Sequence, residues 1–315
     1  MTHDLITMGR VSVDVYPLQT GVPLEKVESF GKYLGGSPTN VAVAAARLGH
    51  RAAVITRTGE DPFGRFVHQA LTGYGVDDRF VTAVPGLPTP LAFCEIFPPD
   101  HFPLYFYRHP KAPDLEIHEH ELDLDAIRAA RIFWATVTGL SEEPSHGSTL
   151  AALAAHPGTT VLDLDWRPMF WASPGEARAR VGRALEHATV AVGNLDECEI
   201  AVGTRGPRDA ARALLDRGVS VAIVKQGPRG TLAASAEGVV EVPPTPVRVL
   251  NGLGAGDAFG GAVCHGLLEG WDLERTVRFA GAAGALVASR LACADAMPTE
   301  DEVGHLLAGR EEAGR

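Results

Sequence analysis

The chain has 315 residues, of which 45% are hydrophobic and 21% charged, so it can bury a substantial core as one large domain or two smaller ones. Lys and Arg number 28 against 39 Asp and Glu, and the net charge of −11 disfavours nucleic acid and anionic membrane surfaces as partners. The 35 glycines follow no collagen-like period and lie among Val, Leu and Ala, so their abundance does not indicate disorder.

Two further features lead us to expect a soluble, cytoplasmic protein. Residues 1–9 lack the basic start and apolar run of a signal peptide, and the longest apolar stretch, 279–288, is too short to span a bilayer. The cysteines are far apart and form no C-x-x-C pair, so we expect reduced, buried thiols at Cys94, Cys198, Cys264 and Cys293.

In chain order, short apolar runs alternate with helix-like segments, which predicts an α/β fold with a mostly parallel sheet and helices on both faces. The first helix is expected over 41–48, with Ser37 as its cap and Pro38 in its first turn. Core strands are predicted to end at Met8, Ile55, Trp134, Leu162, Val192 and Val224. Further helices are predicted over 62–74, 145–155, 176–187, 208–217 and 257–268.

Two segments break this alternation, namely 15–34 and 89–115. They are rich in Pro, aromatic and β-branched residues, and 91–96 and 104–107 have strand character. We expect them to form one small β-sheet that covers the carboxyl edge of the core as a lid. The core would then comprise 1–14, 35–88 and 116–315, with a frayed tail at 310–315.

The segment Asn251-Gly-Leu-Gly-Ala-Gly-Asp257, which precedes a helical pattern, carries the most chemistry. Its alternate glycines can aim bare amides at a ligand, and the helix start adds positive potential, which together predict an anion hole. A carboxylate at the rim of such a hole suits a base that deprotonates a hydroxyl during phosphoryl transfer. On spacing alone, a helix cap after a flexible loop is an equally good interpretation.

A second glycine-rich segment, Gly35-Gly36-Ser-Pro-Thr-Asn40, precedes the first helix. Paired glycines permit a ligand to approach the backbone, and the amide of Asn40 can both donate to and accept from a polyol. Taken alone, such a segment is more often a tight turn before a capped helix.

Together the two segments resemble the signatures of the PfkB, or ribokinase-like, family of carbohydrate kinases, and the resemblance extends over essentially the whole chain. It implies a Rossmann-like core, a β-lid that often mediates homodimerisation, and transfer of the ATP γ-phosphoryl group to a sugar hydroxyl with Mg²⁺. It also implies that Asp257 is the general base and that the amides of Gly254, Ala255 and Gly256 form the anion hole. The residues that would hold sugar hydroxyls are Asp14, Gly35, Gly36 and Asn40.

The resemblance extends to two segments expected at the nucleotide. Asn194 and Glu197 match the family's N-x-x-E motif, in which the Glu organises Mg²⁺, commonly through water. Lys225, Gly227 and Gly230 resemble the nucleotide-binding turn, with the lysine near the phosphates. Without the family, an ordinary helix start is the better interpretation of the first pattern, and a strand exit and hairpin fits the second equally well.

Three departures from the family pattern are present. Asn251-Gly252 replaces the usual Asp-Thr, which leaves a monovalent-cation site open. The residues 280–282 lack the Asn that many members carry near the adenine, so base contacts are expected to be apolar or backbone-mediated. Cys264 falls outside the usual residue set of its signature position, and we expect it to matter only for packing.

The substrate class is suggested by cationic residues near the lid and the strand ends. Tyr107-Arg108 ends a predicted lid strand, and Arg167 follows a core strand. If the two guanidinium groups converge, they favour binding of a carboxylate and hence an acid sugar as substrate. The alternative interpretation is that each Arg forms a structural ion pair.

The segments 30–40, 107–108, 163–168 and 296–298 resemble family members that phosphorylate the terminal hydroxyl of six-carbon keto-deoxy sugar acids. Asp165 favours one of two acid-sugar branches, because the other typically carries Asn there. A kinase for a neutral sugar such as fructose and a non-catalytic sugar or nucleotide sensor remain as alternatives. The chain carries neither a dinucleotide fingerprint after its first strand nor a hydrolase elbow, and His118-Glu-His120 lacks helical zinc-ligand spacing.

Overall fold

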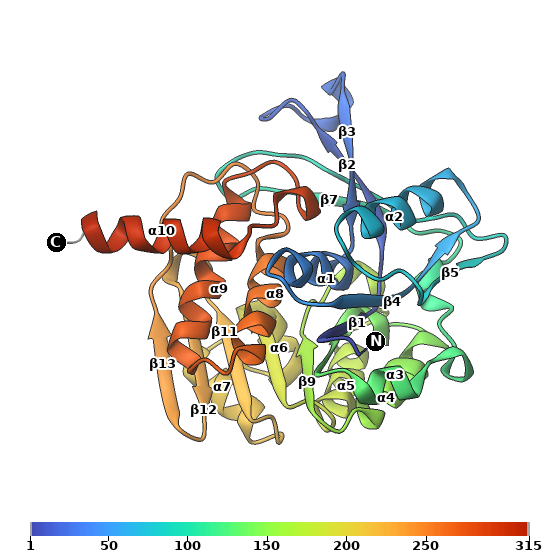
Figure 1. Ribbon diagram of the computed structural model, residues 1–315. Helices are drawn as coiled ribbons and strands as arrows, with labels where there is room; N and C mark the ends of the chain where they lie inside the picture. The colour runs from blue at the N-terminus through green and yellow to red at the C-terminus, as the bar shows by residue number, and fades with distance from the viewer. Residues whose placement is uncertain (1, 314–315) are drawn as a thin grey trace.

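The computed structural model describes residues 2–313, with side chains up to residue 309. Its main sheet has nine strands in the order β13-β12-β11-β10-β9-β8-β1-β4-β5 (Figure 1). Only the β11–β12 and β12–β13 pairings are antiparallel, which confirms the mostly parallel sheet. The strands are β1 Leu5–Met8, β4 Ala52–Gly59, β5 Val81–Val84, β8 Ile132–Thr136, β9 Thr159–Asp163, β10 Val190–Asn194, β11 Val221–Lys225, β12 Thr231–Ser235 and β13 Gly238–Val242.

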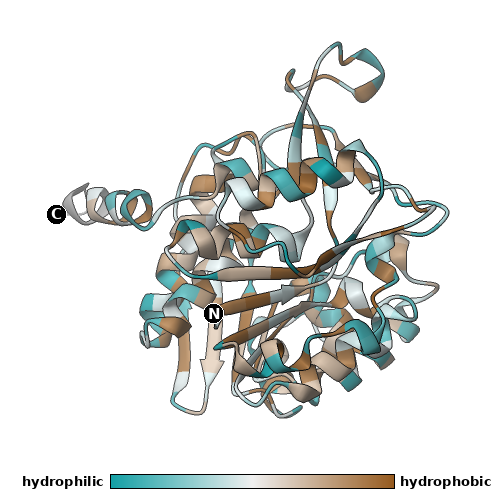
Figure 2. Cartoon of the chain, turned by 45° about the vertical axis from the view of Figure 1, so that its right-hand side comes forward, coloured by the Kyte–Doolittle hydropathy of each residue, from teal (hydrophilic) through white to brown (hydrophobic). Residues whose placement is uncertain are grey.

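Helices cover both faces of this sheet, as the alternating pattern predicted. One face packs on α1 Ser37–Arg47, α2 Pro62–Gly73, α8 Ala255–Leu268, α9 Leu273–Ala288 and α10 Glu300–Ala313. The other packs on α3 Leu124–Ala129, α4 Ser145–Ala155, α5 Pro174–Leu185, α6 Leu195–Val202 and α7 Pro207–Leu215. Because the central strands are buried on both faces, their sequences are mostly apolar, and much of the sheet is brown in Figure 2.

A second, four-stranded sheet has the order β3-β2-β6-β7. It pairs β2 Ser12–Pro17 and β3 Phe30–Gly35 with β6 Leu91–Cys94 and β7 Leu104–Tyr107, so two segments distant in sequence do form one small sheet. Figure 1 shows the outer ends of β2 and β3 extending away from the core. By hydrogen bonding, residues 12–14 belong to this sheet, although we had assigned them to the core.

Several element predictions were wrong at their ends or missing. Strand β4 continues past Ile55 to Gly59, and α1 begins at Ser37, with Gly36 rather than Ser37 in the cap position. The apolar stretch 279–288 is the second half of α9, which we had not predicted as a helix. The expected frayed tail is instead helical through Ala313, while residues 314–315 lie outside the described residues. No helix in the described part of the chain is long and apolar enough to cross a membrane.

Two helices position the glycine-rich segments found in the sequence. Helices α1 and α8 pack closely, because a Cβ on Gly261 would lie only 2.4 Å from the Cβ of Ala44. Their N-terminal ends follow the segments 35–36 and 251–254, respectively. The fold therefore brings two motifs far apart in sequence to one edge of the large sheet.

Candidate active site

Asp257 lies in the first turn of α8, beside the start of α1. The Nδ2 of Asn40 donates a hydrogen bond of 2.7 Å to Oδ2 of Asp257, which joins the two sequence motifs directly. Within the described residues, Oδ1 of Asn40 is buried and has no hydrogen-bond partner. A buried amide oxygen of this kind needs a donor, and a substrate hydroxyl would supply one.

The backbone before Asp257 has the geometry of an anion hole. Gly254 has φ 80°, in the left-handed region, and a Cβ there would lie 2.6 Å from Sγ of Cys293, so only glycine fits. The helix begins at Ala255, and the amides of its first turn have no intrahelical acceptor. The positive end of α8 thus faces the same edge as the Asp257 carboxylate.

The pKa of Asp257 is raised above its ordinary value. Burial is the main cause, and the negative charge of Asp165 adds to it, while hydrogen bonds from Asn40 and Ser37 act in the opposite direction. A carboxylate with a raised pKa is a stronger base, which suits proton abstraction from a hydroxyl.

Lys225, the last residue of β11, lies beside the start of α8. Its Nζ is 3.4 Å from the position that a Cβ on Gly256 would occupy, so the ammonium group adjoins the amides of the α8 start. Burial acts to lower the lysine pKa, but the pKa is raised overall by four carboxylates: Glu197, Asp163, Asp165 and Asp257. The lysine is therefore a charged group beside the anion hole.

Two carboxylates of this cluster, Asp163 and Asp165, were in a segment quoted for its resemblance but had no role assigned. Asp163 ends β9 and accepts a 3.2 Å hydrogen bond from the Ser37 hydroxyl, and burial raises its pKa to about 8. Asp165 is buried between two guanidinium groups, whose charges outweigh burial and lower its pKa. Their position after a buried parallel strand was the signal that could have identified them.

Asn194 and Glu197 form a capping box at the start of α6. The Asn194 side chain accepts from the Glu197 amide at 3.0 Å, and the Glu197 carboxylate accepts from the Asn194 amide at 2.7 Å. The capping interpretation therefore holds. The capping bonds use only one oxygen of the Glu197 carboxylate, which also faces Lys225. Glu197 and Asp163 provide the oxygen donors that Mg²⁺ prefers, so the residues fit a hydrated Mg²⁺ ion.

Asp14 lies within β2 of the small sheet, although we had assigned it to the core. Its carboxylate accepts 2.7 Å hydrogen bonds from the Ser12 and Tyr16 hydroxyls. A Cβ on Gly35 would lie 2.0 Å from Oδ1 of Asp14, so this glycine makes room for the carboxylate itself. Gly36, with φ 102°, packs equally closely on the carbonyl oxygen of Arg10.

The two arginines proposed for a substrate carboxylate are both ion-paired. Nη2 of Arg167 lies 2.7 Å from Asp165, and Nη2 of Arg108 lies 2.7 Å from the buried Asp114. Sequence analysis missed Arg10, which follows β1 and binds the other oxygen of Asp165 at 3.0 Å. Within the described chain, the Nε atoms of Arg10 and Arg167 are buried without an acceptor.

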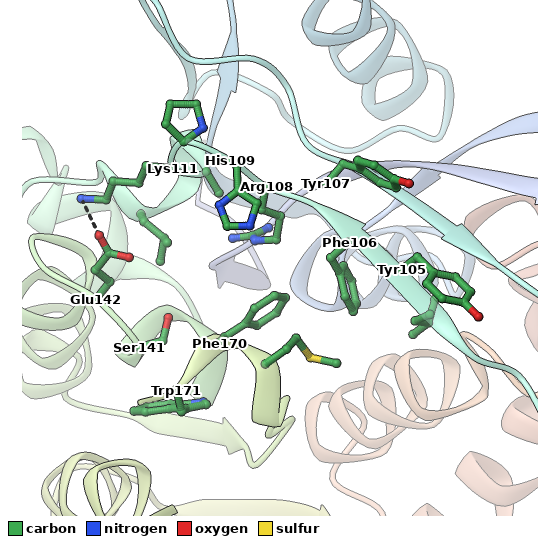
Figure 3. A pocket seen from close by; sticks show the side chains of 15 residues that line it. Tyr105, Phe106, Tyr107, Arg108, His109, Lys111, Ser141, Glu142, Phe170 and Trp171 are labelled. Carbon is green, nitrogen blue, oxygen red and sulfur yellow. Dashed lines mark ion pairs between the residues drawn. The ribbon is translucent and has the colours of Figure 1, made fainter. Parts of the chain in front are cut away.

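Tyr107 and Arg108 border a cavity of about 670 Å³ between β7 and the segment after β9 (Figure 3). The Arg108 guanidinium lies 5.0 Å from the ring of Phe170, which in turn contacts Phe106 at 5.0 Å between ring centroids. Phe106 also lies 5.7 Å from the Arg10 guanidinium. Two aromatic rings therefore connect the cavity to the Arg10–Asp165 pair, although neither Asp257 nor Arg167 lines the cavity.

The turn after Lys225 forms the β11–β12 hairpin. Gly227 and Gly230 have φ 59° and 89°, and the Gln226 amide donates to the Gly230 carbonyl at 2.8 Å. A Cβ on Gly230 would lie 2.1 Å from the Val242 carbonyl oxygen, so the hairpin itself requires this glycine. A nucleotide-binding role of this turn stays a prediction.

Asn251 occupies the position where the family usually has Asp. Its amide is buried, donates to the Leu291 carbonyl at 2.7 Å and accepts from the Leu253 amide at 3.1 Å. The Asn251 side chain thereby joins the loops before α8 and after α9.

Comparison with known proteins agrees with this geometry. Residues 2–300 match the model of the pfkB family of carbohydrate kinases. A 5-dehydro-2-deoxygluconokinase of Clostridium tetani is 31% identical over 98% of this chain and 94% of its own. A protein of the same name from Geobacillus kaustophilus is 33% identical over 94% of this chain and 91% of its own.

Solved structures share the whole architecture. A fructokinase variant of Vibrio cholerae, solved with fructose, ADP and potassium, aligns with a TM-score of 0.83 and 27% identity over 97% of this chain and 99% of its own. A Ribokinase II of E. coli in complex with ATP and Mg²⁺ aligns with a TM-score of 0.87 and 23% identity over 98% and 100% of the two chains. With the Asn40–Asp257 pair at an amide-lined helix start, these matches show that the chain belongs to the pfkB family of carbohydrate kinases.

Proposed function

We propose that this kinase transfers the γ-phosphoryl group of ATP to the terminal hydroxyl of 5-dehydro-2-deoxy-D-gluconate, a reaction of myo-inositol catabolism. The observation that carries the proposal is Asp257, held by Asn40 in front of the free amides of α8 and beside Lys225. The names of the relatives, which align over nearly the whole chain, support the choice of substrate.

Each group at the edge of the sheet has a role in this reaction. Asp257 takes the proton of the sugar hydroxyl, and the amides of Gly254, Ala255 and Gly256 stabilise charge on the transferring phosphoryl group. Lys225 binds the phosphates. Bound Mg²⁺ would neutralise phosphate charge, and Glu197 and Asp163 would hold it through water. For the nucleotide, Asn194 and the turn at Gly227 and Gly230 complete the proposed site.

The sugar lies between the two sheets in this proposal. Asn40 offers its buried, unpaired Oδ1 to a hydroxyl, and Asp14 offers its carboxylate from the small sheet. Gly35 and Gly36 have no side chains, so the sugar can approach the backbone between Asp14 and Asn40. Closure of the small sheet over the sugar would exclude water, so that the sugar hydroxyl is the acceptor.

The carboxylate of the substrate is assigned to Arg108, Arg167 and Tyr107. The ion pairs with Asp114 and Asp165 fix the two guanidinium groups and leave further N–H donors on each. The same donors also suit 2-dehydro-3-deoxygluconate, which is our second candidate substrate. Asp165, fixed by two arginines, favours the first substrate because the other branch typically carries Asn there.

We further propose that the chain is a homodimer through the small sheet and acts in the cytoplasm. Large apolar side chains are exposed on or beside this sheet at Leu18, Phe30, Tyr105 and Tyr107. Such a concentration on one small sheet is typical of a protein interface. The four cysteines are free and buried, which suits a reducing compartment.

Release of ADP from Mg-ATP, measured against a panel of sugars, tests the function. The panel contains 5-dehydro-2-deoxygluconate, 2-dehydro-3-deoxygluconate, fructose and ribose. We expect the highest kcat/KM with the first acid and a kcat lowered by a factor of about 10² to 10⁴ in the Asp257→Asn variant. A preference for fructose would identify a fructokinase, and no ADP release with any sugar would identify a non-catalytic sensor.

A further inference from the structure

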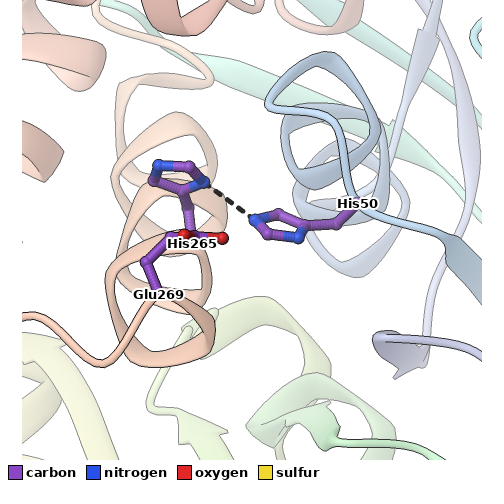
Figure 4. A group of neighbouring side chains, drawn as sticks. All are labelled: His50, His265 and Glu269. Atoms are coloured by element: carbon purple, nitrogen blue, oxygen red, sulfur yellow. Dashed lines mark hydrogen bonds between the residues drawn. The ribbon is translucent and has the colours of Figure 1, made fainter.

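A cluster of metal-ligating side chains lies at the other ends of the two catalytic helices. His50 follows α1, while His265 lies in the last turn of α8 and Glu269 directly after it (Figure 4). His265 and Glu269 are four residues apart, so they share one face of the helix. This cluster plays no part in the proposed phosphoryl transfer, because eight residues of helix, about 12 Å, separate His265 from Asp257.

The ligand atoms of the three residues converge on one point. Nε2 of His50 lies 2.8 Å from Nδ1 of His265, and one oxygen of Glu269 completes a group whose atoms all lie within 4.8 Å of one another. At 2.8 Å the two ring nitrogens can share only one proton between them. A cation bound by both nitrogens would take the place of that proton, with small movements of the half-exposed His50 and the exposed Glu269.

The surroundings fix the central ligand. The His265 ring is buried and stacks on Phe279 at a centroid distance of 5.3 Å. It also makes a T-shaped contact with the Trp271 ring, at a centroid distance of 4.8 Å. Its other nitrogen, Nε2, is buried without a hydrogen-bond partner among the described residues. Within the described part of the chain, the ring therefore makes its only polar side-chain contact through Nδ1, the atom aimed at the cluster.

The charge state of the cluster suits a metal. Neutral imidazole is the form that ligates metal ions. The carboxylate of Glu269 supplies negative charge to balance a divalent cation.

We propose that His50, His265 and Glu269 form a binding site for a divalent transition-metal ion, of which Zn²⁺ is the best fit. Two imidazoles and one carboxylate, with water in the fourth position, are a tetrahedral zinc ligand set. Mg²⁺ prefers oxygen ligands and binds elsewhere in the kinase. The ion would link the ends of α1 and α8 and so hold together the two helices that carry Asn40 and Asp257.

Zinc titration of the full-length, chelator-treated protein by calorimetry tests the site, in the absence of ATP and Mg²⁺. We expect one high-affinity equivalent of Zn²⁺ per chain and a higher midpoint of thermal unfolding with Zn²⁺ bound. Because loss of an outer-shell partner alone weakens metal binding about 10–100-fold, His50→Gln should lower the affinity at least about tenfold. Glu269→Gln should also lower it.

The control is His120→Gln, which removes an exposed histidine from the separate group at 118–120 and should leave affinity unchanged. Unchanged thermal unfolding of metal-free His50→Gln establishes that the variant is folded. The proposal is overturned if wild type binds no stoichiometric Zn²⁺, or if His50→Gln binds it as tightly as wild type. Zinc affinity is measured without substrate, so the result is independent of which sugar the enzyme phosphorylates.

Discussion

Asp257 shows how single residues at this site acquire their chemistry from neighbours. Burial and the nearby Asp165 raise its pKa, while Asn40 limits the rise through a 2.7 Å hydrogen bond. The same hydrogen bond orients the carboxylate beside the amides of α8. The proposed base and its proposed anion hole are thus fixed by residues from two helices.

Replacement of Asp257 by Asn should lower kcat by a factor of about 10² to 10⁴, which is the usual contribution of a general base. The fold should persist, because Asn keeps the size of the side chain. Steady-state ADP release and thermal unfolding measure the two effects. Asp196→Asn, at an exposed carboxylate in the first turn of α6, is the matched control; near-normal turnover of Asp257→Asn would remove Asp257 from the role of base.

The pH dependence of kcat should report the same carboxylate. Since Asp257 must be ionised to act and its pKa is raised, kcat should fall as pH is lowered through that raised pKa. Asn40→Ala removes a hydrogen bond that lowers the pKa, so the acidic limb of the profile should move to higher pH. A limb that stays in place at saturating sugar would contradict the coupling of Asn40 to Asp257.

Arg108 should control the preference for acid sugars. Removing Arg108 alone would leave Asp114 buried without its partner, at a cost of about 3–5 kcal/mol, so the test uses the neutral pair Arg108→Gln/Asp114→Asn. We expect kcat/KM to fall at least about tenfold more for the keto-deoxy acids than for fructose, because a charge-assisted bond is lost. Asp114→Asn alone, which keeps the arginine, is the control. Equal losses for acids and fructose would place the carboxylate elsewhere.

At the scale of elements, strand ends and helix starts gather the charged groups. Asp163 at the end of β9, Lys225 at the end of β11 and Glu197 at the start of α6 face one another beside α8. This arrangement follows from parallel strands, whose carboxyl ends all meet one edge of the sheet. It should also make stability depend on pH at the proposed catalytic site.

Asp163→Asn should therefore change the pH dependence of stability. The carboxyl keeps its proton to about pH 8 in the folded chain but loses it near 3.8 when unfolded, so between these values the native state binds more protons. Stability from this group consequently declines as pH rises through that window. Urea unfolding at pH 5 and pH 8 should show the variant gaining stability relative to wild type at pH 8. A constant difference between the two proteins would contradict the raised pKa.

Clear apolar or helical patterns made some elements predictable, whereas strands at the sheet edges were missed. The end of strand β1 and both ends of helix α4 were predicted correctly, because a buried apolar run or a helical pattern marks them clearly. Strands β5 and β13 were missed, since most of their residues are exposed or half-exposed at the sheet edges. The edge position gives no continuous apolar run for a sequence pattern to detect.

The site was predictable where a backbone motif encodes it. The glycines around 254–256 and the Asn at 40 carry local signals, and the structure brings them together. The partners of Arg108 and Arg167, and the role of Arg10, depend on tertiary contacts between segments that no local pattern connects. Sequence alone therefore left open whether these arginines were free or paired.

At the scale of the whole molecule, two sheets of different character enclose the site. The large sheet is buried on both faces, whereas the small one contributes Asp14 on one strand and exposes aromatic side chains on others. A lid that also forms a dimer interface would link assembly to sugar binding. Phe30, exposed at 39% and packed edge-on against Phe93, lies on this surface.

Phe30→Glu should convert the proposed dimer into a monomer, because a charge would be buried at an apolar contact. Light scattering coupled to size-exclusion chromatography measures the mass. Phe63→Glu, on α2 outside the lid and exposed at 37%, is the matched control and should leave the mass unchanged. A wild type that is already monomeric, or a dimeric Phe30→Glu, would contradict assembly through the small sheet.

The proposed phosphoryl transfer is tested most directly by ³¹P NMR of the product formed from Mg-ATP and 5-dehydro-2-deoxygluconate. The proposed function predicts a new phosphate monoester resonance, coupled to the protons of the terminal carbon, that grows as the γ-phosphate signal of ATP declines. Release of inorganic phosphate alone, or a monoester at any other carbon, would contradict it.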